Sequence, residues 1–227
     1  MCLNNWGGID HKVLEFHEYV NLFSGKSGSG KSTVMDAIQV ILYGSFSPSF
    51  LNKAADDAKN RRSVLSYLRG EQKDGSANRK DCDFCSVIAL EIEDTGTHII
   101  TCIGIAFEVR KSDSEIKKFV YFSHSGKMPE SEYLTEQGVC YSNQEIKKLV
   151  SARTKSDDNR GKGEVNRIYG SKEAYLGTLY DVILGYIDQN RFITMEKSAI
   201  ALKMTNGTGQ FIRCLLYTSP SPRDSTS

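Results

Sequence analysis

The spacing of apolar residues changes where one predicted element gives way to the next. Over 34–42 they recur every three or four positions, which is the spacing of one helix face, and Gly44 follows as a stop signal. Upstream, residues 20–24 form a short, mostly apolar run that is typical of a buried parallel strand. Leu14 and Phe16 alternate with polar neighbours, as in another strand. The chain is therefore predicted to open with strands, a loop and a helix.

Alternation with period two dominates the middle of the chain. Apolar and polar residues alternate over 88–92, a turn is expected at 94–96, and the alternation returns over 99–109 and 119–122. This spacing predicts an antiparallel β-meander. The first of its strands ends in acidic residues, as does a Walker B strand, which carries the catalytic acid of many nucleoside triphosphatases. A Walker B strand is buried on both faces, however, whereas the alternation here predicts one exposed face.

Caps and apolar spacing predict three further helices. A short one lies over 64–68, a capping box at 142–145 opens the second, and Ser171 caps a third that runs to Tyr186. The charged, glycine-bearing stretch 155–164 is predicted to be a loop.

The loop between the predicted strand and the first helix has the spacing of a phosphate-binding P-loop. Residues 25–33 read GKSGSGKST, which fits G-x-x-x-x-G-K-[ST]. Several backbone N–H groups must converge on the phosphate oxygens, and glycines leave room for them. Lys31 would reach the β- and γ-phosphates, and the Ser32 hydroxyl would bind Mg²⁺. The predicted site for ATP and Mg²⁺ comprises Gly25, Lys26, Ser27, Gly28, Ser29, Gly30, Lys31, Ser32 and Thr33.

Composition narrows the function classes only slightly. A chain of 227 residues, 39% of them hydrophobic and 25% charged, suffices for one large domain or two small ones. A net charge of +1 argues neither for nor against a nucleic-acid partner. There is no apolar run of membrane-spanning length and no signal-peptide pattern, so we expect a cytoplasmic protein without a membrane partner.

The cysteines, histidines and tryptophan suggest no further chemistry. Cys82 and Cys85 form a C-x-x-C, but no second pair or close histidine completes a metal site, and reduced thiols are expected. The four histidines lack ligand-spaced partners, and Trp6 is interpreted as a core residue rather than an adenine platform.

The P-loop and its flanks resemble the N-terminal head segment of SMC-like ATPases. The matching blocks are NNWG at 4–7, NLFS plus the loop at 21–33, and DAIQVILYG at 36–44. Within this superfamily the chain is similar to the condensin-like MukB/MksB branch, and there to the JetC-type subunit of the Wadjet anti-plasmid systems. The resemblance spans Leu3 to Arg213 and includes Asn52, Ala54, Ala55, Arg62, Ser63, Tyr67, Leu68, Gly70, Glu71 and 211–213.

This resemblance implies an α/β fold, namely an incomplete P-loop NTPase lobe of the ABC/SMC type with an antiparallel β-meander. In such proteins both ends of a long chain form the head, and the C-terminal half supplies the signature motif and the Walker B acid. The implied partners are that C-terminal half, a second SMC-like head, kleisin-type and accessory subunits, and double-stranded DNA. The parent would be an ATPase for chromosome organisation or plasmid defence, and this chain would bind ATP without efficient hydrolysis.

The resemblance also suggests residues outside the loop. Gln189 and Gln210 are candidates for the Q-loop glutamine that contacts magnesium and the attacking water, and Gln210, beside the matched 211–213 block, joins Lys31 as a candidate catalytic residue. Candidates for DNA sensing are Arg61, Arg62 and Arg69, but interleaved acids make a solvated charged face an equal explanation.

The last residues differ from the rest. Residues 214–227 show no hydrophobic period and resemble a read-through tail, so we expect a head lobe over 1–213 followed by a non-native disordered tail. On this interpretation the chain is the front piece of a longer protein.

One alternative is a self-contained P-loop nucleotide or small-molecule kinase. It would need an arginine-bearing lid and a closed acceptor site, and a meander directly after the P-loop helix suits an ABC-type head better. A GTPase is disfavoured because NKAA at 52–55 lacks the acid of a guanine-reading motif.

Overall fold

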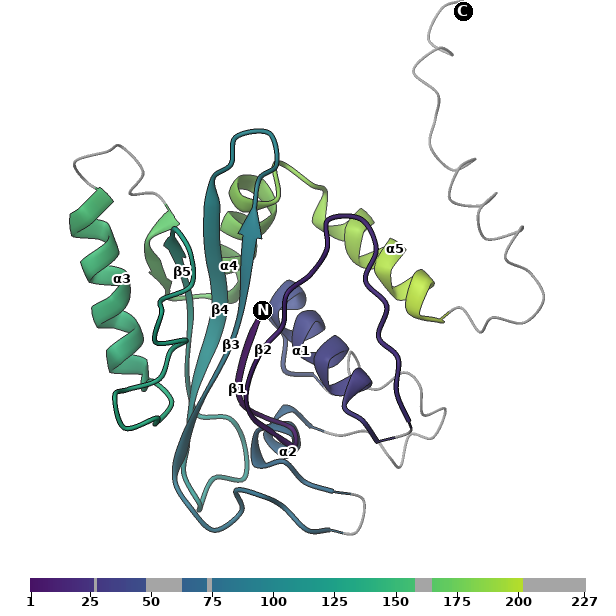
Figure 1. Cartoon of the computed structure of the whole chain (residues 1–227), viewed down its shortest axis with the longest axis vertical. Coiled ribbons are helices and arrows are strands. Elements are labelled where there is room, and N and C mark those ends of the chain that lie inside the picture. The colour runs from purple at the N-terminus through teal and green to yellow at the C-terminus, as the bar shows by residue number, and fades with distance from the viewer. Residues whose placement is uncertain (27, 48–62, 73–74, 158–164, 202–227) are drawn as a thin grey trace, which may run out of the picture. The chain divides into compact units, whose positions relative to one another are not determined.

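One antiparallel sheet organises the first of two units, Met1–Asp188 and Gln189–Ser227 (Figure 1). The computed structural model describes residues 1–26, 28–47, 63–72, 75–157 and 165–201, with the side chains of 157 and 197–201 excepted. The sheet order is β2-β1-β3-β4-β5-β6. Its strands are β1 (Cys2–Trp6), β2 (Ile9–Val13), β3 (Phe84–Glu93), β4 (Ile100–Val109), β5 (Lys118–Ser125) and β6 (Arg167–Tyr169).

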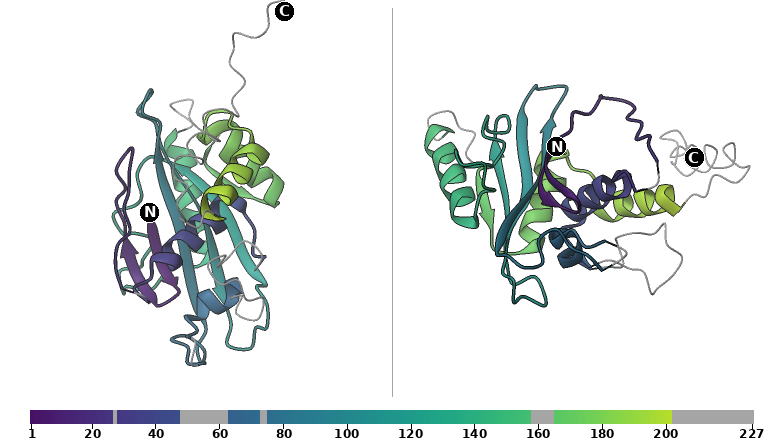
Figure 2. Two further views of the ribbon diagram at one scale, coloured as in Figure 1. Left: turned by 90° about the vertical axis from the view of Figure 1, so that its right-hand side faces the viewer. Right: turned by 60° about the horizontal axis from the view of Figure 1, so that its bottom comes forward.

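Helices cover both faces of this sheet. Helix α3 (Asn143–Asp157) lies on one side, and α1 (Lys31–Tyr43) and α4 (Lys172–Gly177) lie on the other (Figure 2). Helix α2 (Val64–Arg69) packs beside β1, and α4 continues into the π-helix η5 (Thr178–Ile183). In the second unit the structure describes one helix, α5 (Gln189–Ala201). None of the described helices is both long and apolar enough to cross a membrane.

Alternating side chains divide the core into two layers. One cross-strand row faces α1 and α4, and its members in order are Leu3, Ile88, Ile105, Tyr121 and Tyr169. Facing α3 is a cluster formed by Cys2, Val87, Ala89, Ala106, Phe122, Tyr133, Cys140, Ile146 and Val150. Gly104 allows β4 to lie close to β3, since a Cβ there would stand 2.4 Å from the Ile88 carbonyl oxygen.

The predicted meander is confirmed, because β3, β4 and β5 pair antiparallel in sequence. The expectation of one exposed face for β3 is wrong for its first half. Residues 86–89 are buried on both faces, since helices cover both sides of the sheet there, and exposure alternates only over 90–93.

The predicted parallel strand at 20–24 is wrong. Residues 14–25 contain no strand, and Leu14 and Phe16 also lie outside β2. The strands of the opening segment are instead β1 and β2, which join the sheet through β3. An apolar run becomes a strand only when a neighbouring strand satisfies its backbone, and none of the described strands pairs with 20–24.

The predicted helices are confirmed in place, with one difference in type. Gly44 and Gly70 end α1 and α2 in the left-handed conformation, and the 142–145 capping box joins Ser142 N to Glu145 Oε2 at 2.7 Å. Ser171 caps α4 by accepting from Ala174 N, as predicted. However, α4 ends at Gly177, and the run predicted to reach Tyr186 continues as the π-helix η5.

Several predictions fall on residues outside the described ranges. They concern Ser27, Arg61, Arg62, Gln210, most of the 155–164 loop and the 214–227 tail.

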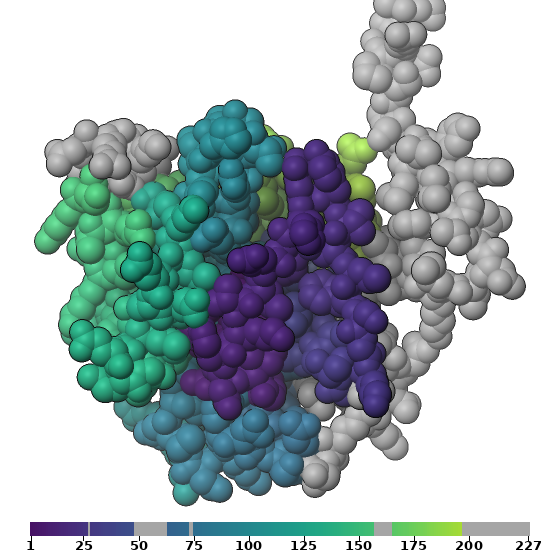
Figure 3. Space-filling view, viewed as in Figure 1, coloured from purple at the N-terminus to yellow at the C-terminus, as the bar shows by residue number. Residues whose placement is uncertain are grey.

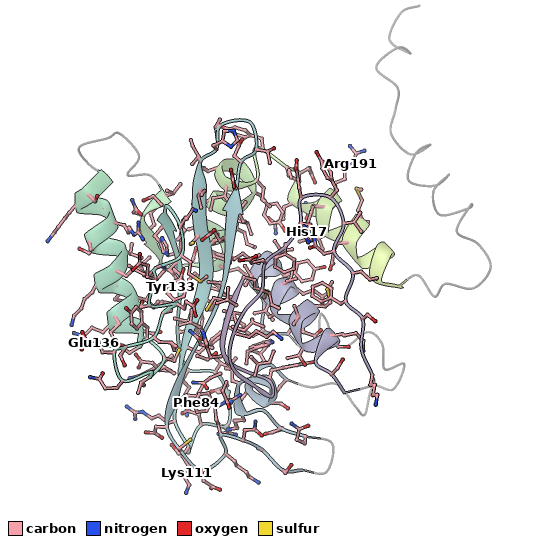
Figure 4. All side chains as sticks on the ribbon, in the orientation of Figure 1. His17, Phe84, Lys111, Tyr133, Glu136 and Arg191 are labelled. Atoms are coloured by element: carbon pink, nitrogen blue, oxygen red, sulfur yellow. The ribbon has the colours of Figure 1, made fainter. Side chains whose placement is uncertain are left out.

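A buried histidine lies in the layer that faces α3. His124 is fully buried, its Nδ1 donates to the Ser125 carbonyl oxygen at 3.0 Å, and its Nε2 accepts from the Tyr133 hydroxyl at 2.9 Å. Figure 4 labels Tyr133, which belongs to the cluster between the sheet and α3. Burial lowers the pKa of His124 from 6.5 to about 4, so the folded protein holds this ring neutral.

We predict that this ring makes stability depend on pH. Below pH 6.5 the unfolded chain protonates His124 while the folded state does not, so the free energy of unfolding falls by about 1.4 kcal/mol per pH unit until pH 4. Urea unfolding at several pH values should show a flatter profile for His124→Gln than for the wild type. The carboxylates titrate in both proteins and cancel from the difference, so parallel profiles would contradict the prediction.

Candidate nucleotide-binding site

The P-loop is closed by its own lysine. The Lys31 ammonium donates to the carbonyl oxygens of Gly25 at 2.6 Å and Lys26 at 2.9 Å, and to Ser29 Oγ at 3.2 Å. These bonds use all three ammonium donors. The loop backbone thereby curls around one positive charge, and an anion that binds there would attract that same charge.

The glycines of the loop have separate structural reasons. Gly28 and Gly30 have φ near +85°, which residues with a Cβ rarely adopt, and both are open on the side where a Cβ would project. Gly25 has a φ of +155°, and a Cβ there would stand 2.6 Å from Ser29 Oγ. Gly28 and Gly30 are therefore required for their backbone conformation alone. Gly25 is required both for its conformation and for the space that it leaves for Ser29.

None of the described side chains caps the backbone N–H groups at the start of α1. Gly30 is the N-cap and contributes no side-chain hydrogen bond, and the first turn contains no acidic residue. The free N–H groups and the positive end of the helix dipole therefore point toward the loop. Ser32 is exposed in this first turn, where its hydroxyl can reach a cation bound beside a phosphate. This combination of donors, lysine and hydroxyl suits a phosphate with its metal.

Contacts from β1 fix the first turn of α1. The indole Nε1 of the fully buried Trp6 donates to the Thr33 carbonyl oxygen at 2.8 Å. Gly7 follows with a φ of +59°, and a Cβ there would stand 2.5 Å from Thr33 Cγ2. The β1–β2 turn thus supports the helix directly beneath the loop. Trp6 is a core residue, as its interpretation from the sequence predicted.

Helix α2 extends this support through a buried carboxylate. The Tyr67 hydroxyl donates to Asp36 of α1, and the Tyr67 ring stacks on Trp6 with centroids 5.1 Å apart. Arg79 joins the same turn by donating to the carbonyl oxygens of Gly7 and Leu68 and to Asp10. No sequence motif assigned a role to Tyr67, Asp36 or Arg79. Asp36 is the one charged residue within 34–43, and that was the available signal for it.

The segment before the loop is exposed and bonded mainly to itself. Asn21 and His17 exchange two hydrogen bonds, of 2.7 and 2.8 Å, and the rings of Phe16 and Phe23 meet edge to face. Its apolar side chains face solvent: Tyr19, Val20 and Leu22 are 87%, 78% and 89% exposed. In the space-filling view the purple N-terminal chain runs over the surface of the unit (Figure 3).

The other candidate residues described by the structure have structural partners or belong to the second unit. The Arg69 guanidinium donates to the carbonyl oxygens of Lys111, at 3.2 Å, and Asp113, so it supports the turn after β4. Gln189 begins α5 in the second unit. Cys82 and Cys85 carry free thiols, and among the described residues no cluster of histidine, cysteine and acidic side chains could hold a metal ion.

Comparison with known families supports the loop assignment. Residues 1–58 match a family model described as the P-loop containing region of an AAA domain. No curated protein matches the chain. The matched range includes the loop, the segment before it and α1, and indicates nucleotide binding, which P-loop domains generally perform with Mg²⁺.

We predict that Gly25→Ala lowers nucleotide affinity at least about tenfold, because the added Cβ displaces Ser29 and adds about 1–3 kcal/mol of backbone strain. The same strain should lower the melting temperature by a few degrees, as it should in the control variant named below. Fluorescent ATP-analogue titration measures the affinity. Gly138→Ala is the matched control, since Gly138 has a φ of +74° and open space in a different turn. Equal effects of the two substitutions on affinity would contradict the assigned role of Gly25.

Proposed function

We propose that the chain binds Mg²⁺–ATP as the Walker A half of an SMC-like ATPase. In the parent protein, ATP would join two heads, hydrolysis would separate them, and the attached coiled coils would act on DNA in chromosome organisation or plasmid defence. The observation that carries the nucleotide part is the Lys31-closed loop on an uncapped helix N-terminus. The SMC-like part rests on the sequence resemblance of Leu3 to Arg213.

Within this proposal, each side chain of the loop has a defined task. Lys31 exchanges its bonds to the Gly25 and Lys26 carbonyl oxygens for the β- and γ-phosphates. Ser32, exposed in the first turn of α1, contributes its hydroxyl to Mg²⁺. Backbone N–H groups at the start of α1 donate to phosphate oxygens. These groups hold the triphosphate but include no acid to orient a water molecule, which phosphoryl transfer requires.

The segment before the loop supports the proposal that a C-terminal half completes the head. Residues 20–24 have an apolar strand composition, yet no described strand pairs with them, and Val20 and Leu22 are largely exposed. A strand supplied by the rest of the parent would satisfy this backbone and cover these side chains. We propose the same C-terminal half as the source of the signature motif and the catalytic acid, and Gln210 remains the proposed Q-loop residue.

The proposed action on DNA and the remaining partners derive from the resemblance alone. They include a second SMC-like head, kleisin-type and accessory subunits, and double-stranded DNA. Arg69 could act in DNA sensing only by giving up its bonds to the turn at 111–113. Arg61 and Arg62 stay as proposed DNA-sensing residues.

We predict that Lys31→Ala weakens Mg²⁺-dependent ATP binding at least about tenfold, because the phosphates lose a charged hydrogen-bond partner. Isothermal titration with ATP and Mg²⁺ measures the affinity. Lys147→Ala, which removes an exposed lysine from α3, serves as the matched control and should bind like the wild type. Equal affinity in the wild type and Lys31→Ala would refute the nucleotide site.

We further predict that this chain alone hydrolyses ATP barely above background. Adding the proposed C-terminal head segment of the parent should restore turnover, and Ser32→Ala should then lower the rate strongly through lost magnesium binding. Phosphate release assays measure both steps. A steady rate from the chain alone that disappears in Lys31→Ala would instead identify a self-contained enzyme, such as the kinase alternative.

A further inference from the structure

The far end of the P-loop helix is held by three buried tyrosine hydroxyls. The last carbonyl groups of an α-helix lack partners within the helix. In α1 they accept hydrogen bonds from residues more than 75 positions away in sequence. The bonds are Tyr175 Oη to Ile41 O at 2.9 Å, Tyr180 Oη to Leu42 O at 2.9 Å, and Tyr121 Oη to Gly44 O at 2.6 Å.

These three tyrosines, here termed the tyrosine clamp, form a packed group with little freedom. Tyr175 is fully buried, and Tyr121 and Tyr180 are 6% and 2% exposed. The rings of Tyr121 and Tyr175 stack with centroids 4.6 Å apart. Gly44 completes the contact, because a Cβ there would stand 3.2 Å from Tyr175 Cδ1. The end of α1 is therefore fixed against β5 and α4 by directional bonds as well as by packing.

Two residues of the clamp flank the change from α-helical to π-helical winding, yet their hydroxyls bond adjacent carbonyl groups of α1. Residues five apart in an α-helix point about 140° away from each other. Tyr175 lies in α4 and Tyr180 in η5, where the Leu184 N–H bonds the Leu179 carbonyl oxygen. The wider winding that begins at Thr178 lies between the two tyrosines, and both hydroxyls bond carbonyl groups of α1.

Burial keeps the clamp hydroxyls protonated. It raises the pKa of Tyr121 and Tyr180 to about 12 and that of Tyr175 well above its ordinary value. The three groups therefore remain hydrogen-bond donors across the physiological pH range.

We propose that Tyr121, Tyr175 and Tyr180 are positioning residues of the nucleotide site, which couple the axial position of the P-loop helix to the α4–η5 segment. The inference rests on the proposed ATP binding at the loop. Helix α1 runs from Lys31, which closes the loop, to the carbonyl groups that the clamp holds. A bound phosphate attracts Lys31 and the first-turn N–H groups and so favours one axial position of this helix. The clamp bonds fix the axial position at the other end, and therefore couple it to α4 and η5.

Reciprocity makes the proposal measurable. If the clamp favours the helix position that binds ATP, then ATP must stabilise the clamp by the same factor. Loss of clamp hydroxyls should weaken ATP binding, and bound ATP should slow amide exchange in α4 and η5. A clamp that only adds stability would affect neither quantity in the folded protein.

The test uses the whole chain and four variants. Tyr175→Phe and Tyr180→Phe each remove one clamp hydroxyl, and the double variant removes both. Tyr133→Phe is the control, because its fully buried hydroxyl bonds His124 in the opposite layer. Thermal unfolding reports stability, titration with a fluorescent ATP analogue reports affinity, and hydrogen exchange with and without Mg²⁺–ATP reports protection of 172–183.

We expect each single variant to lose about threefold and the double variant about tenfold in ATP affinity, if the lost bonds act on the bound state. Tyr133→Phe should lower the melting temperature comparably but bind ATP like the wild type. ATP should protect 172–183 in the wild type, and this protection should be lost in the double variant. If the double variant does not fold, the single variants and the wild-type exchange data still decide.

Two different failures remain distinguishable. Wild-type binding with unchanged affinity in folded clamp variants, or no ATP-dependent protection of 172–183 in the wild type, would overturn the coupling and leave the nucleotide site intact. Absence of ATP binding in the wild type would overturn the proposed function and this inference with it.

Discussion

The site depends on one constraint: α1 must be held firmly while the N–H groups of its first turn stay free. A side-chain cap at the N-terminus would stabilise the helix but would occupy donors that a phosphate needs. Here Gly30 provides no such cap. The support comes instead from β1 and α2, which contact the first turns of α1, and from the tyrosines at its C-terminal end. Trp6 holds the Thr33 carbonyl group, Tyr67 holds Asp36, and tyrosine hydroxyls hold the terminal carbonyl groups. The helix is thus stabilised without loss of its anion-binding end.

The antiparallel sheet positions these supports. Cross-strand pairing carries the row from Leu3 on β1 to Tyr169 on β6, and α1 packs against β3 and β4 while α4 packs against β5 and β6. Residues 14–25 take no part in this strand pairing. They lie on the surface, where Tyr19 and Leu22 are exposed. The loop therefore has a firm helix on one side and an unpaired apolar segment on the other. That asymmetry fits a lobe that gains a strand from elsewhere, as proposed.

Local rules explain the elements that the sequence predicted correctly. The α1 helix, its Gly44 stop, the 142–145 capping box and the meander all depend on spacing, caps and alternation within a few residues. The prediction failed at 20–24, because a strand depends on a neighbour that local composition does not reveal. The P-loop motif is visible in the sequence because its spacing is itself the signal, and the family model over 1–58 supports it. The clamp was not, because its hydroxyls and their acceptors are separated by more than 75 positions.

Hydrogen bonds to its carbonyl groups fix the axial position of α1 more sharply than apolar packing alone. Apolar contacts are non-directional, so they constrain the axial position of a helix less sharply than a hydrogen bond does. A hydroxyl that donates to one carbonyl oxygen loses its partner after a shift of about 1 Å, and a buried donor without a partner costs about 1–3 kcal/mol. Supports at Thr33 and at Ile41 act near opposite ends of α1, so together they specify its axial position. In the proposed complex, the distance between Lys31 and a phosphate would thereby depend on residues outside the loop.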